Sequence, residues 1–178
     1  MPRFVAFLRA LNVGGAHVVK MDALKRHFEA MGFTDVETFI ASGNVVFTAR
    51  SAKGLDGKIA KALERELGHP VATFVRPCGD LAVLAAHEPF PKAAVAAALS
   101  LSVGFLSTEL DADALKRLKA LETDEDRFHV RGRELWWLSR VPQSEAAISG
   151  KVLERALGQP TTLRNVNTVR RMAERFSG

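Results

Sequence analysis

The chain has 178 residues, of which 47% are hydrophobic and 25% are charged, a composition that is ordinary for a folded globular protein and gives no indication of disorder. Cys78 is the only cysteine, so an internal disulfide and a disulfide-stapled secreted domain are both excluded. No apolar run reaches the roughly 20 residues that a membrane-spanning helix needs. Arg9 also interrupts the apolar start where a signal sequence would continue. The sequence therefore predicts a cytoplasmic protein with no membrane partner.

The formal net charge of +5 is concentrated at the two ends of the chain. Residues 1–20 carry a net +3 and residues 160–178 carry another +3, so the long middle segment sums to −1. Such a distribution can form a local anion-binding site without making the whole surface basic. Solubility charge on a solvated helix explains the C-terminal arginines equally well, and both interpretations stay open.

The first half of the sequence predicts a regular alternation of strands and helices. An apolar run that begins at Arg3 predicts a strand, and apolar residues at helical spacing predict helices over 21–31 and 55–67. Runs rich in β-branched residues predict further strands over 36–40, 44–48 and 71–76. A turn at 41–43 joins the first two of these into a hairpin. The order is strand, helix, strand, strand, helix, strand.

The same order recurs in the second half, after an interruption over residues 79–99 that has the composition of a linker with a short helix. Thr108 to Asp111 matches a capping box and predicts the start of a helix, and a second helix is predicted over 148–156. Predicted strands cover 101–106, 128–131, 134–138 and 161–163. A basic helix over 168–176 completes the chain.

This order, with right-handed crossovers, is typical of the ferredoxin-like or α/β-plait arrangement. The sequence predicts an α+β protein of two tandem ferredoxin-like subdomains, with a helical linker and a C-terminal helix. The expected division is 1–78, a linker over 79–99, and 100–178. The first and third strands of such a unit are antiparallel neighbours, so residues 9–12 are expected to meet residues 42–44.

Three motifs run along the chain: FLRALNVGG from residue 7, SGNVVF from residue 42 and TLRNVNTV from residue 162. Through them, and in this order, the chain resembles the bacterial family called domain of unknown function 1697. The resemblance implies two α/β-plait subdomains and no established activity, cofactor or substrate. The chain departs from the family pattern before Lys151, where it reads PQSE over 142–145.

The first motif supplies a candidate anion site. Arg9 ends a strand that is expected to be central, and a buried guanidinium has to be paired inside the protein or to face a ligand. Asn12, Gly14 and Gly15 follow between a strand and a helix, where backbone amides and the helix dipole favour anions. A turn with positive φ is the structural alternative. The loop matches neither the P-loop nor the dinucleotide-binding fingerprint.

The other two motifs offer similar chemistry. Arg164, Asn165 and Asn167 follow the last predicted strand and repeat the arginine and asparagine of the first motif. Helix capping explains one of these asparagines without a ligand. Ser42 and Asn44 either orient a ligand or form a hairpin turn.

The remaining polar and aromatic residues give weaker signals. The five histidines and Cys78 show no metal-ligand spacing, no catalytic arrangement can be read from residue order, and no cofactor is expected. Asp124, Glu125 and Asp126 read as a solvated turn. Trp136 and Trp137 alternate along a predicted strand, so their rings point to opposite faces, and one of them is either exposed or packed against the other subdomain.

The leading hypothesis is binding of an anionic ligand, a nucleotide or nucleic-acid phosphate, in a cleft between the two subdomains. Arg9 and Arg164 would supply charge, and the remaining polar groups of the motifs would orient the ligand. One alternative is an enzyme that acts on a small phosphorylated or carboxylated metabolite with help from Lys20 or Lys151. Another is a scaffold whose motifs are purely structural. Fold analogy does not choose among them, and oligomeric state and enzymatic activity stay open.

Overall fold

The structure is a computed structural model that describes residues 1–9, 18–40, 43–142, 145 and 147–178. The chain divides into two compact units: unit 1 is Met1–Leu84 with Met172–Gly178, and unit 2 is Ala85–Arg171. Each unit contains one four-stranded antiparallel sheet, so the protein is of the α+β class. The subdomain boundaries expected from the sequence stay a prediction.

Unit 1 follows the predicted order of strands and helices. Its elements are β1 (Arg3–Arg9), α1 (Met21–Ala30), β2 (Thr34–Thr38), β3 (Asn44–Thr48), α2 (Leu55–Leu67), β4 (Ala72–Pro77) and the start of α3 (Asp80–Ala86). The strands are ordered β2-β3-β1-β4 in the sheet. The expected pairing of β1 with β3 is confirmed, and the amide of Leu8 donates to the carbonyl of Gly43 at 2.8 Å. Residues 10–12 and 42 of that expectation lie outside the described residues.

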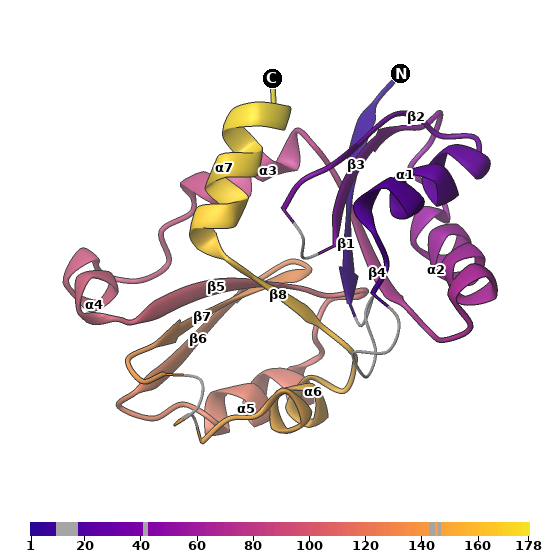
Figure 1. Ribbon diagram of the computed structural model, residues 1–178. Helices are drawn as coiled ribbons and strands as arrows, with labels where there is room; N and C mark the ends of the chain where they lie inside the picture. The colour runs from indigo at the N-terminus through magenta and orange to yellow at the C-terminus, as the bar shows by residue number, and fades with distance from the viewer. Residues whose placement is uncertain (10–17, 41–42, 143–144, 146) are drawn as a thin grey trace. The chain divides into compact units, whose positions relative to one another are not determined.

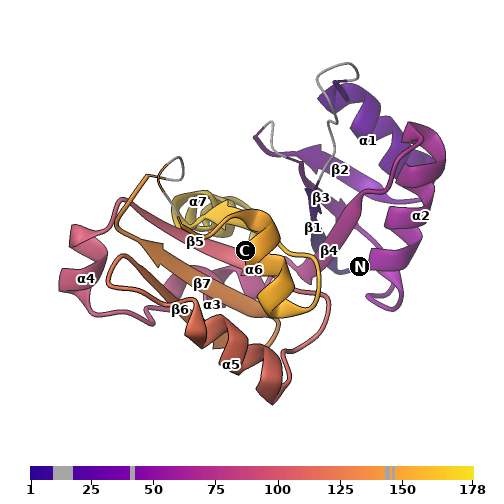
Figure 2. The same ribbon diagram turned by 90° about the horizontal axis from the view of Figure 1, so that it is seen from below.

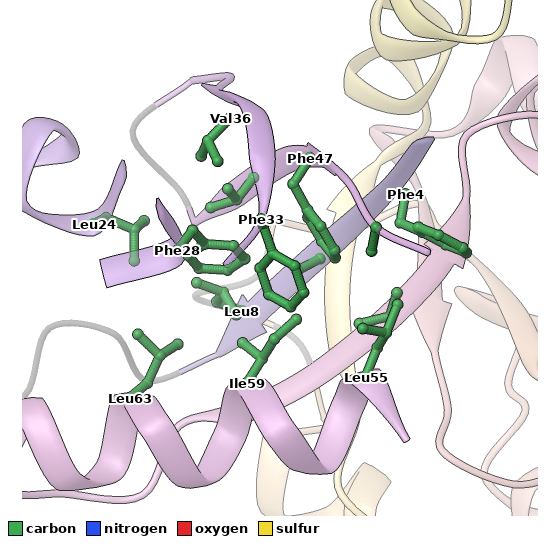
Figure 3. Packing of buried hydrophobic residues seen from close by; sticks show 14 of the residues in the cluster. Phe4, Leu8, Leu24, Phe28, Phe33, Val36, Phe47, Leu55, Ile59 and Leu63 are labelled. Carbon is green, nitrogen blue, oxygen red and sulfur yellow. The ribbon is translucent and has the colours of Figure 1, made fainter. Parts of the chain in front are cut away.

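The core of unit 1 lies between its sheet and helices α1 and α2, which cover the same face (Figure 2). Phe4 and Leu8 point to this face because side chains alternate along β1. Figure 3 shows them with Phe28 of α1, Phe47 of β3 and Ile59 of α2. The Phe28 and Phe47 rings lie 5.5 Å apart, within the range of favourable aromatic contacts. Burial of each such side chain stabilises the unit by roughly 1.5–3 kcal/mol.

The C-terminal end of α7 (Val166–Phe176) belongs to unit 1 through its last turn. The Phe176 side chain is buried and meets the ring of Phe39 edge-on at 5.6 Å. The guanidinium of Arg3 lies 5.4 Å from the same ring, in cation–π geometry. Arg175 forms an ion pair with Glu37. These contacts fix the last turn of α7 on the N-terminal sheet.

Unit 2 repeats the architecture with different residues. Its elements are α4 (Lys92–Ala97), β5 (Ser100–Phe105), α5 (Ala112–Ala120), β6 (Asp126–Arg131), β7 (Glu134–Ser139), α6 (Gly150–Leu157), β8 (Thr162–Asn165) and the first turns of α7. The sheet order is β6-β7-β5-β8. Helices α5 and α6 cover one face, and the first turns of α7 lie over the other (Figure 1). No helix among the described residues is both long and apolar enough to cross a membrane.

The start of α5 corrects the predicted capping box. The N-cap is Asp111, whose carboxylate accepts from the amide of Ala114 at 2.7 Å. Thr108 lies outside the helix, and its carbonyl accepts from the side chain of Gln159 at 3.0 Å. Asp111 fits the N-cap because its carboxylate accepts a hydrogen bond from a free helical amide. Its negative charge also interacts favourably with the positive end of the helix dipole.

The two tryptophans of β7 are both buried, so the alternative of an exposed ring is excluded. They point to opposite faces as predicted, and Trp136 is 0% and Trp137 7% exposed, so neither ring is on the surface. Both faces of this sheet are covered, which the strand pattern alone does not reveal. Asp126 is 1% exposed and accepts a hydrogen bond from Trp137, so the solvated-turn interpretation is wrong for this residue.

Candidate functional site

The residues expected at a site fall into two groups. Asn12, Gly14, Gly15 and Ser42 lie outside the described residues. Arg9, Lys20, Asn44, Arg164, Asn165 and Asn167 are described. Among the latter, Arg9 ends β1 opposite Ala72 of β4, is half-buried and has an interaction partner. Lys20 is exposed and directly precedes α1.

Asn44 lies at the base of the β2–β3 hairpin and is fully buried. Its side-chain amide donates to the carbonyl of Phe39 at 3.0 Å, and its backbone carbonyl accepts from the amide of Phe39 at the same distance. These bonds join the two sides of the hairpin. These hydrogen bonds support the structural alternative for Asn44, a role in the hairpin turn.

Arg164 lies in β8 of unit 2 and is 8% exposed. Its Nη1 donates to Oγ1 of Thr162 at 2.7 Å and to the carbonyl of Leu163 at 3.0 Å. Burial lowers the pKa of the guanidinium to about 10, so the group keeps its proton at neutral pH. Its charge is therefore stabilised by hydrogen bonds inside unit 2.

The two asparagines after β8 have different roles. Oδ1 of Asn165 accepts from the amide of Asn167 at 2.9 Å, and so caps the first turn of α7. Oδ1 of Asn167 accepts from Nη1 of Arg170 at 3.2 Å, one turn further along the helix. Asn167 therefore orients the side chain of Arg170.

Arg170 lines a cavity of about 280 Å³ in unit 2, which we call the α4–α7 cavity. Its lining comes from the segment before α4, from α4 itself, from β5 and from α7, and includes His87, Phe90, Lys92, Val95, Leu101 and Arg170. Figure 1 shows α4 leading directly into β5. The cavity thus brings two cationic side chains together with aromatic and aliphatic ones.

His87 forms a neutral wall of this cavity. Nη1 of Arg131 lies 3.0 Å from Nδ1 of His87, and because a guanidinium only donates, the imidazole accepts there and carries its proton on Nε2. Burial, followed by the charges of Arg131 and His129, lowers the pKa of His87 below its ordinary value of 6.5. The ring is therefore uncharged at neutral pH.

The ring of Trp136 packs against the ring of His87. The two ring centroids are 4.6 Å apart and the rings meet edge-on. Trp136 Nε1 and His87 Nε2 are buried and have no hydrogen-bond acceptor among the described residues. An edge-on contact between two aromatic rings is favourable at this distance. The wall is fixed by β6 and β7 of the sheet.

The patterns of the sequence do not predict this cavity. Lys92 lies in the alanine-rich part of the predicted linker, and Arg170 was one of several basic residues near the C-terminus. The one local indication in the sequence is Asn167, because capping of the helix accounts for Asn165 alone. Elsewhere in the described ranges, no group of three or more His, Cys, Asp or Glu side chains could hold a metal ion.

The match to a family profile assigns the chain to a protein family. The profile of a family described as a protein of unknown function, DUF1697, matches residues 1–136, so the chain belongs to this family. The matched range holds the FLRALNVGG and SGNVVF motifs and ends before TLRNVNTV.

Among solved structures, the chain is similar to the conserved bacterial protein SP0830 from Streptococcus pneumoniae, with 21% sequence identity, 97% of each chain covered and a TM-score of 0.67. At this identity the similarity shows the fold alone. No match to the chain was found among curated proteins.

Proposed function

We propose that this protein binds an anionic ligand in the α4–α7 cavity. One observation carries the proposal: Arg170, which lines the cavity, is oriented by Asn167 through a hydrogen bond of 3.2 Å. A guanidinium that is already oriented loses less conformational entropy when it pairs with an anion. Lys92 adds a second cation to the same lining.

This proposal keeps the class of function expected from the sequence and adds residues to it. Nucleotide or nucleic-acid phosphate, the ligand named from the sequence, stays one of the candidates. The roles of Arg9, Arg164 and the polar residues of the motifs stay predictions, as does a ligand cleft between the two halves of the chain. Arg170 and Lys92 take the charge-bearing role in the cavity.

Isothermal titration calorimetry tests the proposal with inorganic phosphate, AMP, simple carboxylates and a short oligonucleotide. For any anion that binds, Arg170→Ala is expected to lower the affinity about tenfold, because one charge-assisted contact is lost. Lys116→Ala is the matched control, since Lys116 is an exposed cation of α5 that does not line the cavity. Absence of binding by all of these anions would refute the proposal.

A scaffold without a ligand is the second candidate function. The observation that favours it is the internal use of polar groups of the motifs: Asn44, Arg164 and Asn165 all bond to groups of their own unit. If this function is correct, Asn165→Ala lowers the melting temperature and no anion raises it. The enzyme hypothesis with Lys20 or Lys151 stays a prediction from the sequence.

We also infer that each unit is a ferredoxin-like subdomain. The sheet orders β2-β3-β1-β4 and β6-β7-β5-β8 support this, because in both the first and third strands of the unit are central neighbours. The two helices on one face of each sheet support it as well. The cytoplasmic location stays a proposal that rests on the sequence.

A further inference from the structure

We infer that the ligand of the α4–α7 cavity is a small monoanionic carboxylate with an apolar body, rather than a nucleotide. This inference rests on the proposed function, since it names the chemical class of the ligand in the same cavity. Three features of the lining support it: its net charge, its apolar surface and its size.

The charges of the lining favour a single negative charge on the ligand. Among the described lining residues, Lys92 and Arg170 are the cations and Glu88 is the carboxylate. His87 contributes no charge at neutral pH, because Arg131 donates to its Nδ1 and burial disfavours the imidazolium. The lining therefore carries a net +1. A carboxylate balances this charge, whereas the phosphate of a mononucleotide brings about −1.5 to −2 and leaves an excess.

The apolar part of the lining favours a hydrocarbon body. Leu101, Val95 and Phe90 present aliphatic and aromatic carbon to the cavity. Leu101 is 8% exposed, and Val95 and Phe90 are half-buried, so a ligand against them would remove further carbon surface from water. The hydroxyl groups of a ribose would lose their hydrogen bonds to water on entering, and among the described lining residues Glu88 is the only carboxylate that could replace them.

The size of the cavity agrees with a small ligand. Its volume of about 280 Å³ lies just below the range of roughly 300–1,000 Å³ found for small-molecule sites. A single ring or a short chain with one carboxylate suits such a volume. All nine of the lining residues that the structure describes belong to unit 2.

The experiment compares ligands that differ in one property. Calorimetry on the full chain uses phenylacetate and hexanoate as probes, phenylacetamide as the neutral counterpart of phenylacetate, and AMP and inorganic phosphate as the competing class. Phenylacetate is expected to bind at least about tenfold more tightly than phenylacetamide and more tightly than AMP. The amide keeps the ring and loses the charge, so this difference isolates the contribution of Lys92 and Arg170.

Variants then locate the site. Arg170→Ala and Lys92→Ala are each expected to weaken phenylacetate binding about tenfold. Val95→Ser is expected to weaken phenylacetate binding several-fold and to leave phosphate binding nearly unchanged. Leu115→Ser is the matched apolar control, because Leu115 is 42% exposed on α5 and does not line the cavity. Lys92 is exposed, so Lys92→Ala tests the site even if Val95→Ser lowers stability.

The possible outcomes separate this inference from the proposed function. If AMP or phosphate binds more tightly than phenylacetate, and Arg170→Ala abolishes that binding, the inferred ligand class is wrong while the proposed function stands. If no anion binds, both are wrong. If phenylacetate binds equally well to the Arg170→Ala and Val95→Ser variants, the cavity is not its site and the inference is overturned.

Discussion

Nε1 of Trp137 donates a hydrogen bond to Oδ1 of Asp126 at 2.9 Å, across the neighbouring strands β7 and β6. Both side chains are buried. Trp137 also packs in the core under α5 and α6, with Leu118 and Leu153. The carboxylate therefore satisfies the only polar atom of a large core side chain, and it ties the start of β6 to that core.

Asp126→Ala is expected to lower the free energy of unfolding by about 1–3 kcal/mol, because it leaves the indole N–H of Trp137 buried without an acceptor. Asp126→Asn keeps an acceptor oxygen and is expected to cost less. Urea denaturation, followed by tryptophan fluorescence, measures both variants. Asp124→Ala, two residues away and exposed, serves as the control and should stay within about 0.5 kcal/mol of the parent. Equal stability of Asp126→Ala and the control would contradict the assignment.

Asn44→Ala is expected to destabilise unit 1 by about 1–2 kcal/mol, because the carbonyl of Phe39 loses the donor that now lies 3.0 Å away. Thermal denaturation measures the loss. If Asn44 acts only on a ligand, the variant will keep the parent melting temperature without ligand.

Phe176→Ala is expected to release the last turn of α7 from unit 1, because it removes the ring that contacts both Phe39 and Arg3. Truncation of a buried phenylalanine costs about 3–5 kcal/mol when the neighbours do not close the gap. Hydrogen exchange of residues 172–176 should accelerate in the variant. Glu174→Ala, an exposed position of the same turn, should leave the exchange unchanged.

Asn167→Ala is expected to weaken anion binding about threefold, and Arg170→Ala about tenfold, because the first only frees the guanidinium that the second removes. Calorimetry with the tightest-binding anion gives both affinities. Asn165→Ala removes the cap of α7 without changing the partner of Arg170. This variant should lower the melting temperature and leave the affinity for the anion nearly unchanged. A larger loss of affinity in Asn167→Ala than in Arg170→Ala would exclude an orienting role.

Cys78 should make the protein less stable at alkaline pH. Burial, opposed by the smaller effect of the Arg3 charge, raises the pKa of the Cys78 thiol from its ordinary value of 9.0 to about 11. Because the unfolded thiol ionises first, this contribution is intact below pH 9.0 and is lost as the pH rises towards about 11. At about 1.4 kcal/mol per pH unit, this loss is at most about 3 kcal/mol.

The Cys78→Ala variant tests this dependence. Its free energy of unfolding should fall less steeply than that of the parent between pH 9 and 11, and in parallel with it between pH 7 and 8. Chemical denaturation at a series of pH values gives both slopes. Parallel slopes over the whole range would show that the thiol does not contribute.

The order of elements follows from local patterns in the sequence. Apolar spacing at Leu55, Ile59 and Leu63 defines α2 because one face of a helix has to be buried. Gly68, at φ 79°, ends that helix because its backbone conformation is one that other residues rarely adopt. The neighbouring positions of β1 and β3 follow from this order and from the handedness of crossovers. These features depend on contacts between residues close in the sequence, or on the rules that govern how strands and helices are connected.

The burial of both tryptophans and the contents of the cavity follow from contacts distant in sequence. Whether Trp136 is exposed depends on what covers the second face of its sheet, and a strand pattern describes only the strand. His87 and Arg131 are separated by 44 positions, and Asn167 gains its role only from the side chain of Arg170. The sequence by itself determined an α+β chain with two similar halves and basic ends. Only the tertiary structure decided which cations share a cavity, because pairing of side chains depends on distance in space rather than on order in the chain.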